Sequence, residues 1–428
     1  MPTTRRLFLG IGVSAAAAAA LSSCSSHADG GSSKGITLWT HNGGNKEELA
    51  VVQSAVNAFN KEHSESAVRI EAFPQAAYND AIAAAAVSGD LPDILDLDGP
   101  VMPNWAWAGY LAPLQLSSQL ESSIIASAKG YWNDKLYSVG PYDTSLCFLG
   151  RRSALEEIGA RTPSVAEPWT KEEFNDVLKE LGTLKQYEYA IDMSVADGAE
   201  WWPYAYAPML QSFGGDLIDR SDFSTAKGFL NSPEAVAWGT WFRSLFADGL
   251  SSQTPATDGQ DFLQGKVPMY YAGGWKVLQA QETFGIDEVL ILPPVDFGKG
   301  AHVGGGSWQW GVSATSKKPE AANKFIEFLM QDHYLVEYSN AIGNFPSVGS
   351  ATPSTKNYRD GGPLSPVREI GESFALLRPA TPGYKVISSI FDKAARDIVS
   401  GAGVKSTLDQ AADDIDFDIK SNDGYKAA

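Results

Sequence analysis

Residues 36–39 read Ile36-Thr37-Leu38-Trp39, residues 68–72 read Val68-Arg69-Ile70-Glu71-Ala72, and residues 93–97 read Asp93-Ile94-Leu95-Asp96-Leu97. Each run is rich in β-branched or aromatic residues and predicts a strand. Between them, residues 46–62 carry apolar side chains at helical spacing, and residues 75–88 predict an Ala-rich helix that Gly89 ends. Strands that alternate with helices need crossover connections, so the sequence predicts an α/β fold with mainly parallel sheets.

The same alternation continues through the remaining chain. Residues 187–193, 267–271 and 289–292 are predicted strands, and residues 232–247 are a predicted helix. The last third, from Lys318 onward, is expected to be mostly helical. A chain of 428 residues has room for two or three domains.

Charge and cysteine content exclude several classes of protein. Acidic residues outnumber basic ones 51 to 33, and the net charge of −18 disfavours nucleic acid or an anionic lipid surface as a partner. The two cysteines cannot form a disulfide framework or a zinc cluster, and the five histidines are not at metal-ligand spacing. We therefore expect no metal and no cofactor.

The N-terminal residues are typical of an export signal. Thr4-Arg5-Arg6-Leu7-Phe8-Leu9 is a twin-arginine pattern before an apolar stretch, and Leu21-Ser22-Ser23-Cys24 resembles a bacterial lipobox. We interpret residues 1–23 as a lipoprotein signal peptide, Cys24 as the lipidated residue and residues 24–35 as a flexible tether. The alternative is a plain secretory signal with a chance cysteine. Cys147 lies in an apolar run and is expected to be a buried structural residue.

Motifs for catalysis are missing from the sequence. The chain has no G-x-S-x-G and no H-E-x-x-H, and residues 259–266 lack the spacing of a P-loop. We therefore expect no enzymatic activity. Carboxylates are nevertheless too numerous for the sequence to exclude a glycosidase pair.

Aromatic residues in Gly-rich or loop-like segments are the clearest functional signal. The set comprises Trp105, Trp107, Trp201, Trp202, Tyr204, Trp275, Trp308 and Trp310. A flat ring beside Gly-Gly can lie against the apolar face of a sugar, whereas carboxylates such as Asp98 and Asp143 accept sugar hydroxyls and Arg378 donates. The alternative for each Trp is ordinary core packing.

The chain resembles the family 1 extracellular solute-binding proteins of bacterial ABC sugar importers, in the maltose/trehalose-binding branch. The pieces that carry the resemblance occur in the family's order at residues 36–39, 88–94, 108–114, 262–269, 273–275, 305–312, 317–322 and 378–384. The resemblance implies a periplasmic-binding-protein-like fold with two α/β lobes and a three-segment hinge. We place lobe 1 at residues 36–141 plus 303–348 and lobe 2 at residues 145–299 plus 350–428.

The resemblance also implies where the ligand binds. The family's sugar contacts carry over onto Asn42, Gly43, Asp98, Asp143, Trp275, Gly306, Trp308 and Arg378. Asp98 is preferred to Asp96 because it lies nearer the carboxyl end of its predicted strand. Trp308 and Trp310 share one face of a predicted strand, so one is expected to stack on sugar and the other to support it.

These observations predict a non-enzymatic binding protein that captures an oligosaccharide, such as maltose, maltodextrin or trehalose, and delivers it to ABC permease subunits. A lipid anchor on the outer face of the bacterial cell membrane and a monomeric state are expected. The alternatives are a secreted carbohydrate-active enzyme and a binding protein for a solute other than sugar.

Overall fold

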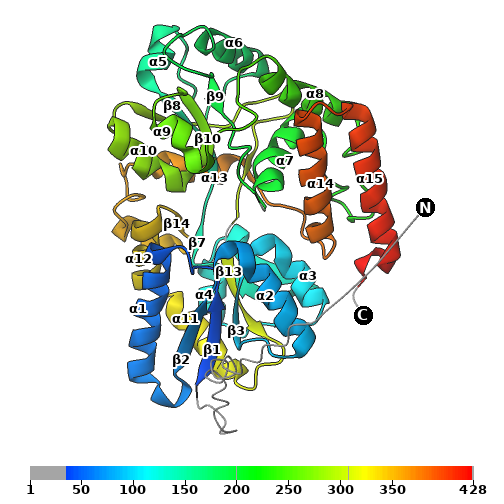
Figure 1. Cartoon of the computed structure of the whole chain (residues 1–428). Coiled ribbons are helices and arrows are strands. Elements are labelled where there is room, and N and C mark those ends of the chain that lie inside the picture. Colours follow the sequence, from blue (N-terminus) through cyan, green and yellow to red (C-terminus); the bar gives the residue numbers. More distant parts are fainter. Residues whose placement is uncertain (1–34, 199, 307, 427–428) are drawn as a thin grey trace, which may run out of the picture. The chain divides into compact units, whose positions relative to one another are not determined.

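Two β-sheets with separate sets of helices organise the described part of the chain, residues 35–426 except 199 and 307, in this computed structural model (Figure 1). The first lobe contains a seven-stranded sheet, in the order β2-β1-β3-β13-β6-β5 with β4 paired to β13. Its strands are β1 (Ile36–Thr40), β2 (Val68–Ala72), β3 (Ile94–Asp98), β4 (Leu111–Ala112), β5 (Lys129–Trp132), β6 (Lys135–Val139) and β13 (Trp308–Ser313).

The second lobe contains a four-stranded sheet in the order β11-β8-β10-β9. Its strands are β8 (Leu146–Arg151), β9 (Ile191–Asp192), β10 (Met269–Gly273) and β11 (Val289–Leu292). Two short strand pairs lie outside both sheets: β7 (Tyr142–Asp143) with β14 (Phe345–Pro346), and β12 (Val303–Gly304) with β15 (Ala375–Leu376). Of these strands, β7, β12 and β14 lie in the connections between the lobes, and β15 follows α13.

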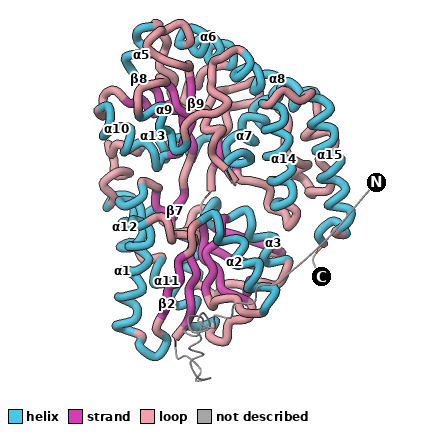
Figure 2. Tube along the Cα trace, in the orientation of Figure 1, coloured by secondary structure: helices cyan, strands magenta, loops and turns pink. Residues whose placement is uncertain are grey.

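Each lobe has its own set of helices around its sheet (Figure 2). The first lobe has α1 (Lys46–Glu62), α2 (Gln75–Ser88), α3 (Met102–Trp107), α4 (Ser118–Ser123), α11 (Pro319–Leu329) and α12 (Asp332–Ile342). The second lobe has α5 (Arg152–Glu157), α6 (Lys171–Leu181), α7 (Trp201–Phe213), α8 (Pro233–Ala247), α9 (Gln260–Leu263), α10 (Val277–Phe284), α13 (Ser365–Phe374), α14 (Tyr384–Val399) and α15 (Val404–Ser421).

Local sequence signals explain the first helices. Asn45 caps α1, because its side chain accepts a hydrogen bond from the backbone N–H of Glu48 at 3.2 Å. Gly89 ends α2 in the left-handed conformation, at φ 79°, which glycine adopts without strain. Both helices have the bounds predicted from the sequence.

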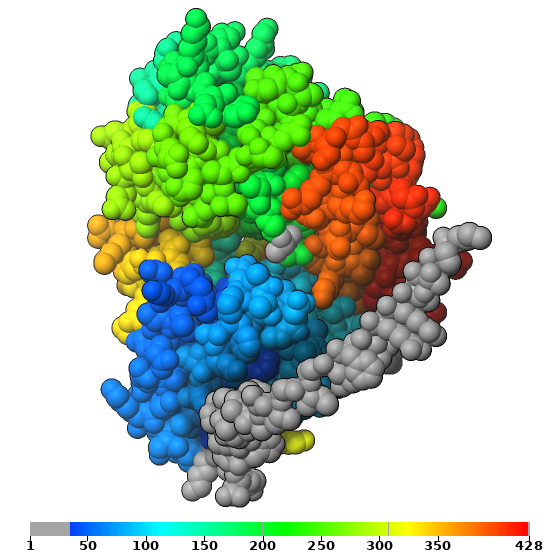
Figure 3. All heavy atoms as spheres, viewed as in Figure 1, coloured from blue at the N-terminus to red at the C-terminus, as the bar shows by residue number. Residues whose placement is uncertain are grey.

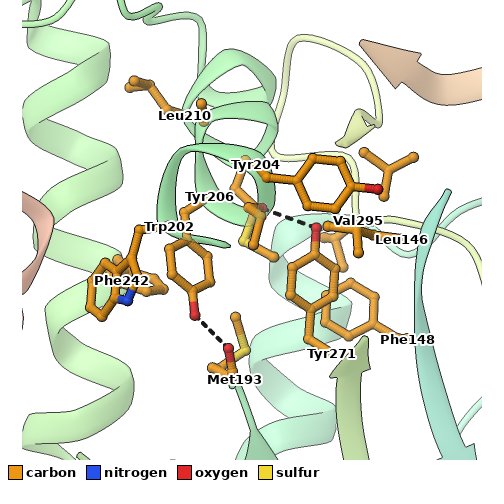
Figure 4. Close-up of a cluster of buried hydrophobic side chains, with 14 of the residues drawn as sticks. Leu146, Phe148, Met193, Trp202, Tyr204, Tyr206, Leu210, Phe242, Tyr271 and Val295 are labelled. Carbon is orange, nitrogen blue, oxygen red and sulfur yellow. Dashed lines mark hydrogen bonds between the residues drawn. The ribbon is translucent and has the colours of Figure 1, made fainter. Parts of the chain in front are cut away.

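Alternation along the strands fills both faces of the first sheet. On β3, Ile94 joins the core formed with α1, α11 and α12, whereas Leu95 and Leu97 join the opposite core formed with α2 and α3. The second lobe has one large core around β8, β10, α7 and α8, part of which is shown in Figure 4. There, the buried Tyr206 donates a hydrogen bond to the Met193 carbonyl at 2.5 Å.

Two of the expectations from the sequence are wrong in detail. The sheets are mixed rather than mainly parallel, because β13 runs antiparallel to β3 and β6, and β8 runs antiparallel to β10 and β11. Both β8 and β13 begin just after the chain has crossed from the other lobe. Each therefore starts at the end of its sheet that faces the other lobe, and runs opposite to its neighbours. The predicted strand 187–193 is reduced to β9. Before it, the N–H of Tyr187 bonds to the carbonyl of Leu184, and where it begins, the N–H groups of Ala190 and Ile191 both bond to the carbonyl of Leu250.

The chain passes between the lobes in three connections. They lie between β6 and β8, between β11 and β13, and between α12 and α13. The exact lobe boundaries predicted from the sequence remain a proposal.

The C-terminal helices α14 and α15 pack on α7 and α8, and their surface is orange to red in Figure 3. The ends of this segment also touch the first lobe. Asn104 Nδ2 donates to the Pro382 carbonyl at 2.8 Å, and Trp107 Nε1 donates to the Lys426 carbonyl at 3.1 Å. None of the described helices is both long enough and apolar enough to cross a membrane.

Candidate functional site

A cavity of about 1130 Å³ lies where the two lobes meet. Residues of both lobes and of the connections form its wall. They are His41, Gly44, Asn45, Glu47, Glu48, Gln75, Asp98, Tyr142, Thr144, Asp197, Gly198, Glu200, Trp201, Tyr204, Asp258, Trp275, Lys276, Leu278, Gln279, Glu282, Gly306, Trp308, Ala341, Ile342, Asn344 and Arg378. A volume of this size accommodates a small oligosaccharide.

The structure brings five of the predicted ligand residues to this wall: Asp98, Trp275, Gly306, Trp308 and Arg378. In the same order, they come from the carboxyl end of β3, the helical turn after β10, the connection before β13, the start of β13 and the loop after β15. These positions are separated by up to 280 residues in the chain, and the crossings between lobes bring them together.

The other three predicted residues do not line the cavity. Asn42 is buried, and Gly43 packs so tightly on the backbone just after β2 that an added Cβ would lie 2.6 Å from the carbonyl carbon of Phe73. Asp143 is buried behind Gly306, where its carboxylate accepts hydrogen bonds from the Ser127 hydroxyl and from the backbone N–H groups of Thr144 and Gly306. Both side-chain polar atoms of Asn42 are buried without a hydrogen-bond partner. A role of these three residues in ligand binding remains a proposal. Cys24 lies outside the described residues.

Arg378 forms an ion-pair network across the cavity. Its two terminal nitrogens donate to the two carboxylate oxygens of Asp98, each at 2.9 Å, and one of them also lies 3.2 Å from Glu200. Burial lowers the pKa of Arg378, but the charges of Asp98, Tyr384 and Glu200 together outweigh this effect, so the pKa is raised. Burial raises the pKa of Asp98, and the guanidinium opposes this shift. Because Asp98 belongs to the first lobe and Glu200 to the second, Arg378 links the lobes.

Glu200 is anchored where α7 begins. Besides Arg378, it accepts hydrogen bonds from the Tyr384 hydroxyl at 2.6 Å and the Ser388 hydroxyl at 2.5 Å, both on α14. The guanidinium of Arg378 also lies 5.0 Å from the centre of the Tyr204 ring. The polar end of the site is therefore held by several elements at once.

Trp275 is the most exposed aromatic ring in the wall, at 36%. It follows Gly273 and Gly274 at the end of β10, and its indole folds back over the strand end. A Cβ on Gly273 would lie 1.9 Å from a ring carbon of Trp275, so this position requires glycine. The Gly-Gly-Trp sequence thus determines where the indole lies.

Trp308 and Trp310 have different surroundings. Trp308 is half-buried and reaches the cavity, whereas Trp310 is 2% exposed and belongs to the core of the first lobe. Of the other aromatic residues identified in the sequence, Trp201 and Tyr204 line the cavity. Trp105 and Trp202 are buried, and Trp107 packs on Tyr425 at the surface.

Polar atoms without protein partners also face this region. Within the described residues, the Thr144 hydroxyl, the Tyr204 hydroxyl and the Asn344 side-chain oxygen are buried, belong to the cavity wall and have no hydrogen-bond partner. A buried polar group without a partner is costly, so these atoms are suited to a polar ligand.

Carboxylates dominate the charge of the wall. Glu47, Glu48, Asp98, Asp197, Glu200, Asp258 and Glu282 face the cavity, opposed by Lys276 and Arg378. Lys276 is paired with Asp258. Such a wall offers many acceptors for hydroxyl groups and repels an anionic ligand.

Two functional candidates were missed at the sequence level, His41 and Glu200. His41 directly precedes the predicted pair Asn42 and Gly43, and only the bend after β1 shows that it faces the cavity. Glu200 gives no local signal, because its partners come from distant segments.

No group of three or more His, Cys, Asp and Glu side chains among the described residues could hold a metal ion. Cys147 is fully buried, and burial raises the pKa of its thiol to about 12, so it is an inert core residue as predicted.

Comparison with known proteins adds independent information. A family model described as bacterial extracellular solute-binding protein matches residues 54–361. The diacetylchitobiose binding protein DasA of Streptomyces coelicolor is 21% identical over 365 residues, covering 82% of each chain. The maltodextrin-binding protein MdxE of Bacillus subtilis is 22% identical over 263 residues, covering 57% of this chain and 60% of MdxE.

Among solved structures, the maltose/maltodextrin-binding domain MalE from Bdellovibrio bacteriovorus, bound to maltotriose, has a similar fold. The TM-score is 0.74 at 18% identity, and the match covers 90% of this chain and 100% of that one. This likeness confirms the two-lobed α/β fold.

Proposed function

We propose that this chain, which belongs to the bacterial extracellular solute-binding proteins, is the sugar-capturing component of an ABC importer. An oligosaccharide binds in the cavity between the lobes and is then delivered to the permease. The observation that carries the proposal is the cavity wall itself, which combines the exposed indole of Trp275 with carboxylates and buried polar atoms that have no protein partner.

The ligand class is an uncharged α-glucoside such as maltose, maltodextrin or trehalose. The acidic wall supports an uncharged ligand, since it disfavours phosphorylated or carboxylated sugars. The names of MdxE and of the MalE domain support maltodextrins, whereas the name of DasA supports a β-linked amino sugar as the second candidate.

Residues Asp98, Trp275, Gly306, Trp308 and Arg378 form the proposed binding site. Trp275 stacks on a sugar ring, and Asp98 and Arg378 bond to hydroxyl groups once their mutual ion pair rearranges. Gly306 has a positive φ of 107°, so only glycine easily allows this backbone to approach the ligand.

Export and anchoring complete the proposal. The signal-like residues 1–23 and the lipobox-like Cys24 support a lipid-anchored protein on the outer face of the cell membrane. We expect a Cys24→Ser variant to lose the lipid label and to keep its sugar affinity. A Cys24→Ser protein that still incorporates labelled lipid would contradict this interpretation.

A thermal-shift panel tests the function. Maltose, maltotriose, trehalose and diacetylchitobiose are each titrated against the purified protein, and a ligand raises the melting temperature by mass action. We expect at least one α-glucoside to do so with 1:1 stoichiometry in calorimetry and without conversion during prolonged incubation. Hydrolysis products would instead support a carbohydrate-active enzyme, and no response to any sugar would overturn the proposal in favour of another solute.

A further inference from the structure

His41 lies directly against one of the tryptophans in the proposed site. Its imidazole and the Trp308 indole are stacked, with ring centres 3.5 Å apart and planes at 9°. Both residues line the cavity. A sugar that stacks on Trp308 can therefore use only the face of the indole that His41 leaves uncovered.

Neighbouring strands fix the position of His41. It follows β1, and Asp96 lies on the adjacent β3, which pairs with β13 so that Trp308 lies opposite Asp98. His41 Nδ1 donates to a carboxylate oxygen of Asp96 at 2.5 Å, and the same oxygen accepts the Thr40 hydroxyl at 2.8 Å. The imidazole is thus held on one side by an ion pair and on the other by the indole.

Charged groups around His41 favour its protonated form. Burial lowers the pKa of His41, but the surrounding carboxylates together, led by the charge and hydrogen bond of Asp96, outweigh this effect, so the pKa is raised. The carboxylates of Glu48 on α1 and Asp98 on β3 also face it and act in the same direction. Tyr78 of α2 presents its ring edge at 6.5 Å. An imidazolium over an indole face is a favourable cation–π contact.

We propose that His41 is a positioning residue for sugar binding: with its ring held by Asp96, it fixes the Trp308 indole and determines which face meets the ligand. The inference rests on the proposed sugar-binding function. It assigns to His41 a role through Trp308 rather than a direct bond to the sugar.

A double-mutant cycle tests this role. We expect His41→Gln, which keeps a hydrogen-bond donor for Asp96 but lacks the flat ring, to lower sugar affinity about 3- to 10-fold. In a Trp308→Ala background, the same change should have no further effect. His333→Gln, an exposed histidine on α12, is the control and should leave affinity unchanged. Equal losses from His41→Gln in both backgrounds would overturn the inference.

Tryptophan fluorescence provides a readout that needs no ligand. A protonated imidazole in contact with an indole quenches its emission. The emission of Trp308, measured as the difference between the wild type and Trp308→Phe, should therefore rise as the pH increases through the raised pKa of His41. Sugar affinity should fall over the same pH range, because the neutral imidazole no longer makes the cation–π contact with Trp308. In His41→Phe, which keeps a ring but cannot be protonated, both pH dependences should vanish.

The outcomes separate this inference from the proposed function. If no sugar binds but the emission of Trp308 titrates with His41, the stack exists and the sugar-binding function fails. If sugar binds and His41→Phe retains the wild-type pH dependence, the sugar function stands and His41 does not position Trp308.

Discussion

At the residue scale, the tryptophans divide by their surroundings. Trp275 is 36% exposed in the cavity, whereas Trp238 of α8 is fully buried between Phe242 and Phe391. We expect Trp275→Ala to cost about 1–3 kcal/mol of sugar affinity and to leave the melting temperature of the sugar-free protein almost unchanged. Trp238→Ala should instead cost about 3–5 kcal/mol of unfolding free energy. Calorimetric titration and thermal melting of both variants check this, and a similar stability loss at both positions would exclude the cavity role of Trp275.

Asp143, a ligand residue in the resemblance, bonds to three neighbouring residues in the structure. Its Oδ1 accepts the N–H groups of Thr144 and Gly306 at 2.7 and 3.0 Å, and its Oδ2 accepts the Ser127 hydroxyl. An asparagine keeps Oδ1 as the acceptor for both N–H groups, and its Nδ2 can donate to the Ser127 hydroxyl instead of accepting from it. We therefore expect Asp143→Asn to change both stability and sugar affinity little. Asp143→Ala leaves two buried N–H groups unpaired and should cost roughly 1–3 kcal/mol of unfolding free energy. A large affinity loss in Asp143→Asn at unchanged stability would show that the carboxylate contacts the ligand.

The sequence identified several residues of the candidate site, but it did not show which residues surround them. Asp98, Trp275, Gly306, Trp308 and Arg378 share one cavity, but nothing local revealed that Arg378 bonds to Asp98 or that His41 stacks on Trp308. Those contacts join strands and loops from distant parts of the chain, so they depend on the fold.

At the element scale, prediction succeeded where the signals are local. The bounds of α1 and α2 follow from apolar spacing, Asn45 and Gly89, all of which act within one helix. The predicted strand 187–193 is shorter than expected, because its partners, β10 and the carbonyl of Leu250, lie more than fifty residues away and leave no local signal. The prediction of mainly parallel sheets was wrong because strand directions depend on where the chain crosses between the lobes, which no local signal shows.

The end of β10 offers a test of one element. A methyl group at Gly273 would overlap the Trp275 ring, whereas one at Gly349 would meet nothing within 4 Å. We expect Gly273→Ala to displace the indole and lower sugar affinity by about tenfold, and Gly349→Ala to leave it unchanged. Titration of a sugar monitored by calorimetry measures both. Unchanged affinity in Gly273→Ala, with the protein folded by circular dichroism, would mean that the position of Trp275 is not determined by this glycine.

At the scale of the whole molecule, the family match confirms the resemblance that the ordered sequence pieces indicated. The α/β class with two lobes is also confirmed, whereas the mainly parallel sheets are not. Binding proteins of two lobes bind ligand by hinge closure, in which the lobes rotate about their connections. In this structure, polar contacts already join the lobes at two separate places, around Arg378 and around α3.

The α3 contact should oppose opening of the sugar-free protein. Trp107 donates to the Lys426 carbonyl and packs edge-on against Tyr425, with ring centres 5.2 Å apart. We expect Trp107→Ala to increase the radius of gyration of the sugar-free protein in small-angle X-ray scattering, because one of the contacts between the lobes is lost. Saturating sugar should restore the wild-type value, since the ligand favours the closed lobes. Phe417, 73% exposed on α15, provides the control, and Phe417→Ala should leave the radius unchanged. An identical radius in Trp107→Ala and the wild type, with and without sugar, would show that this contact does not restrain the lobes.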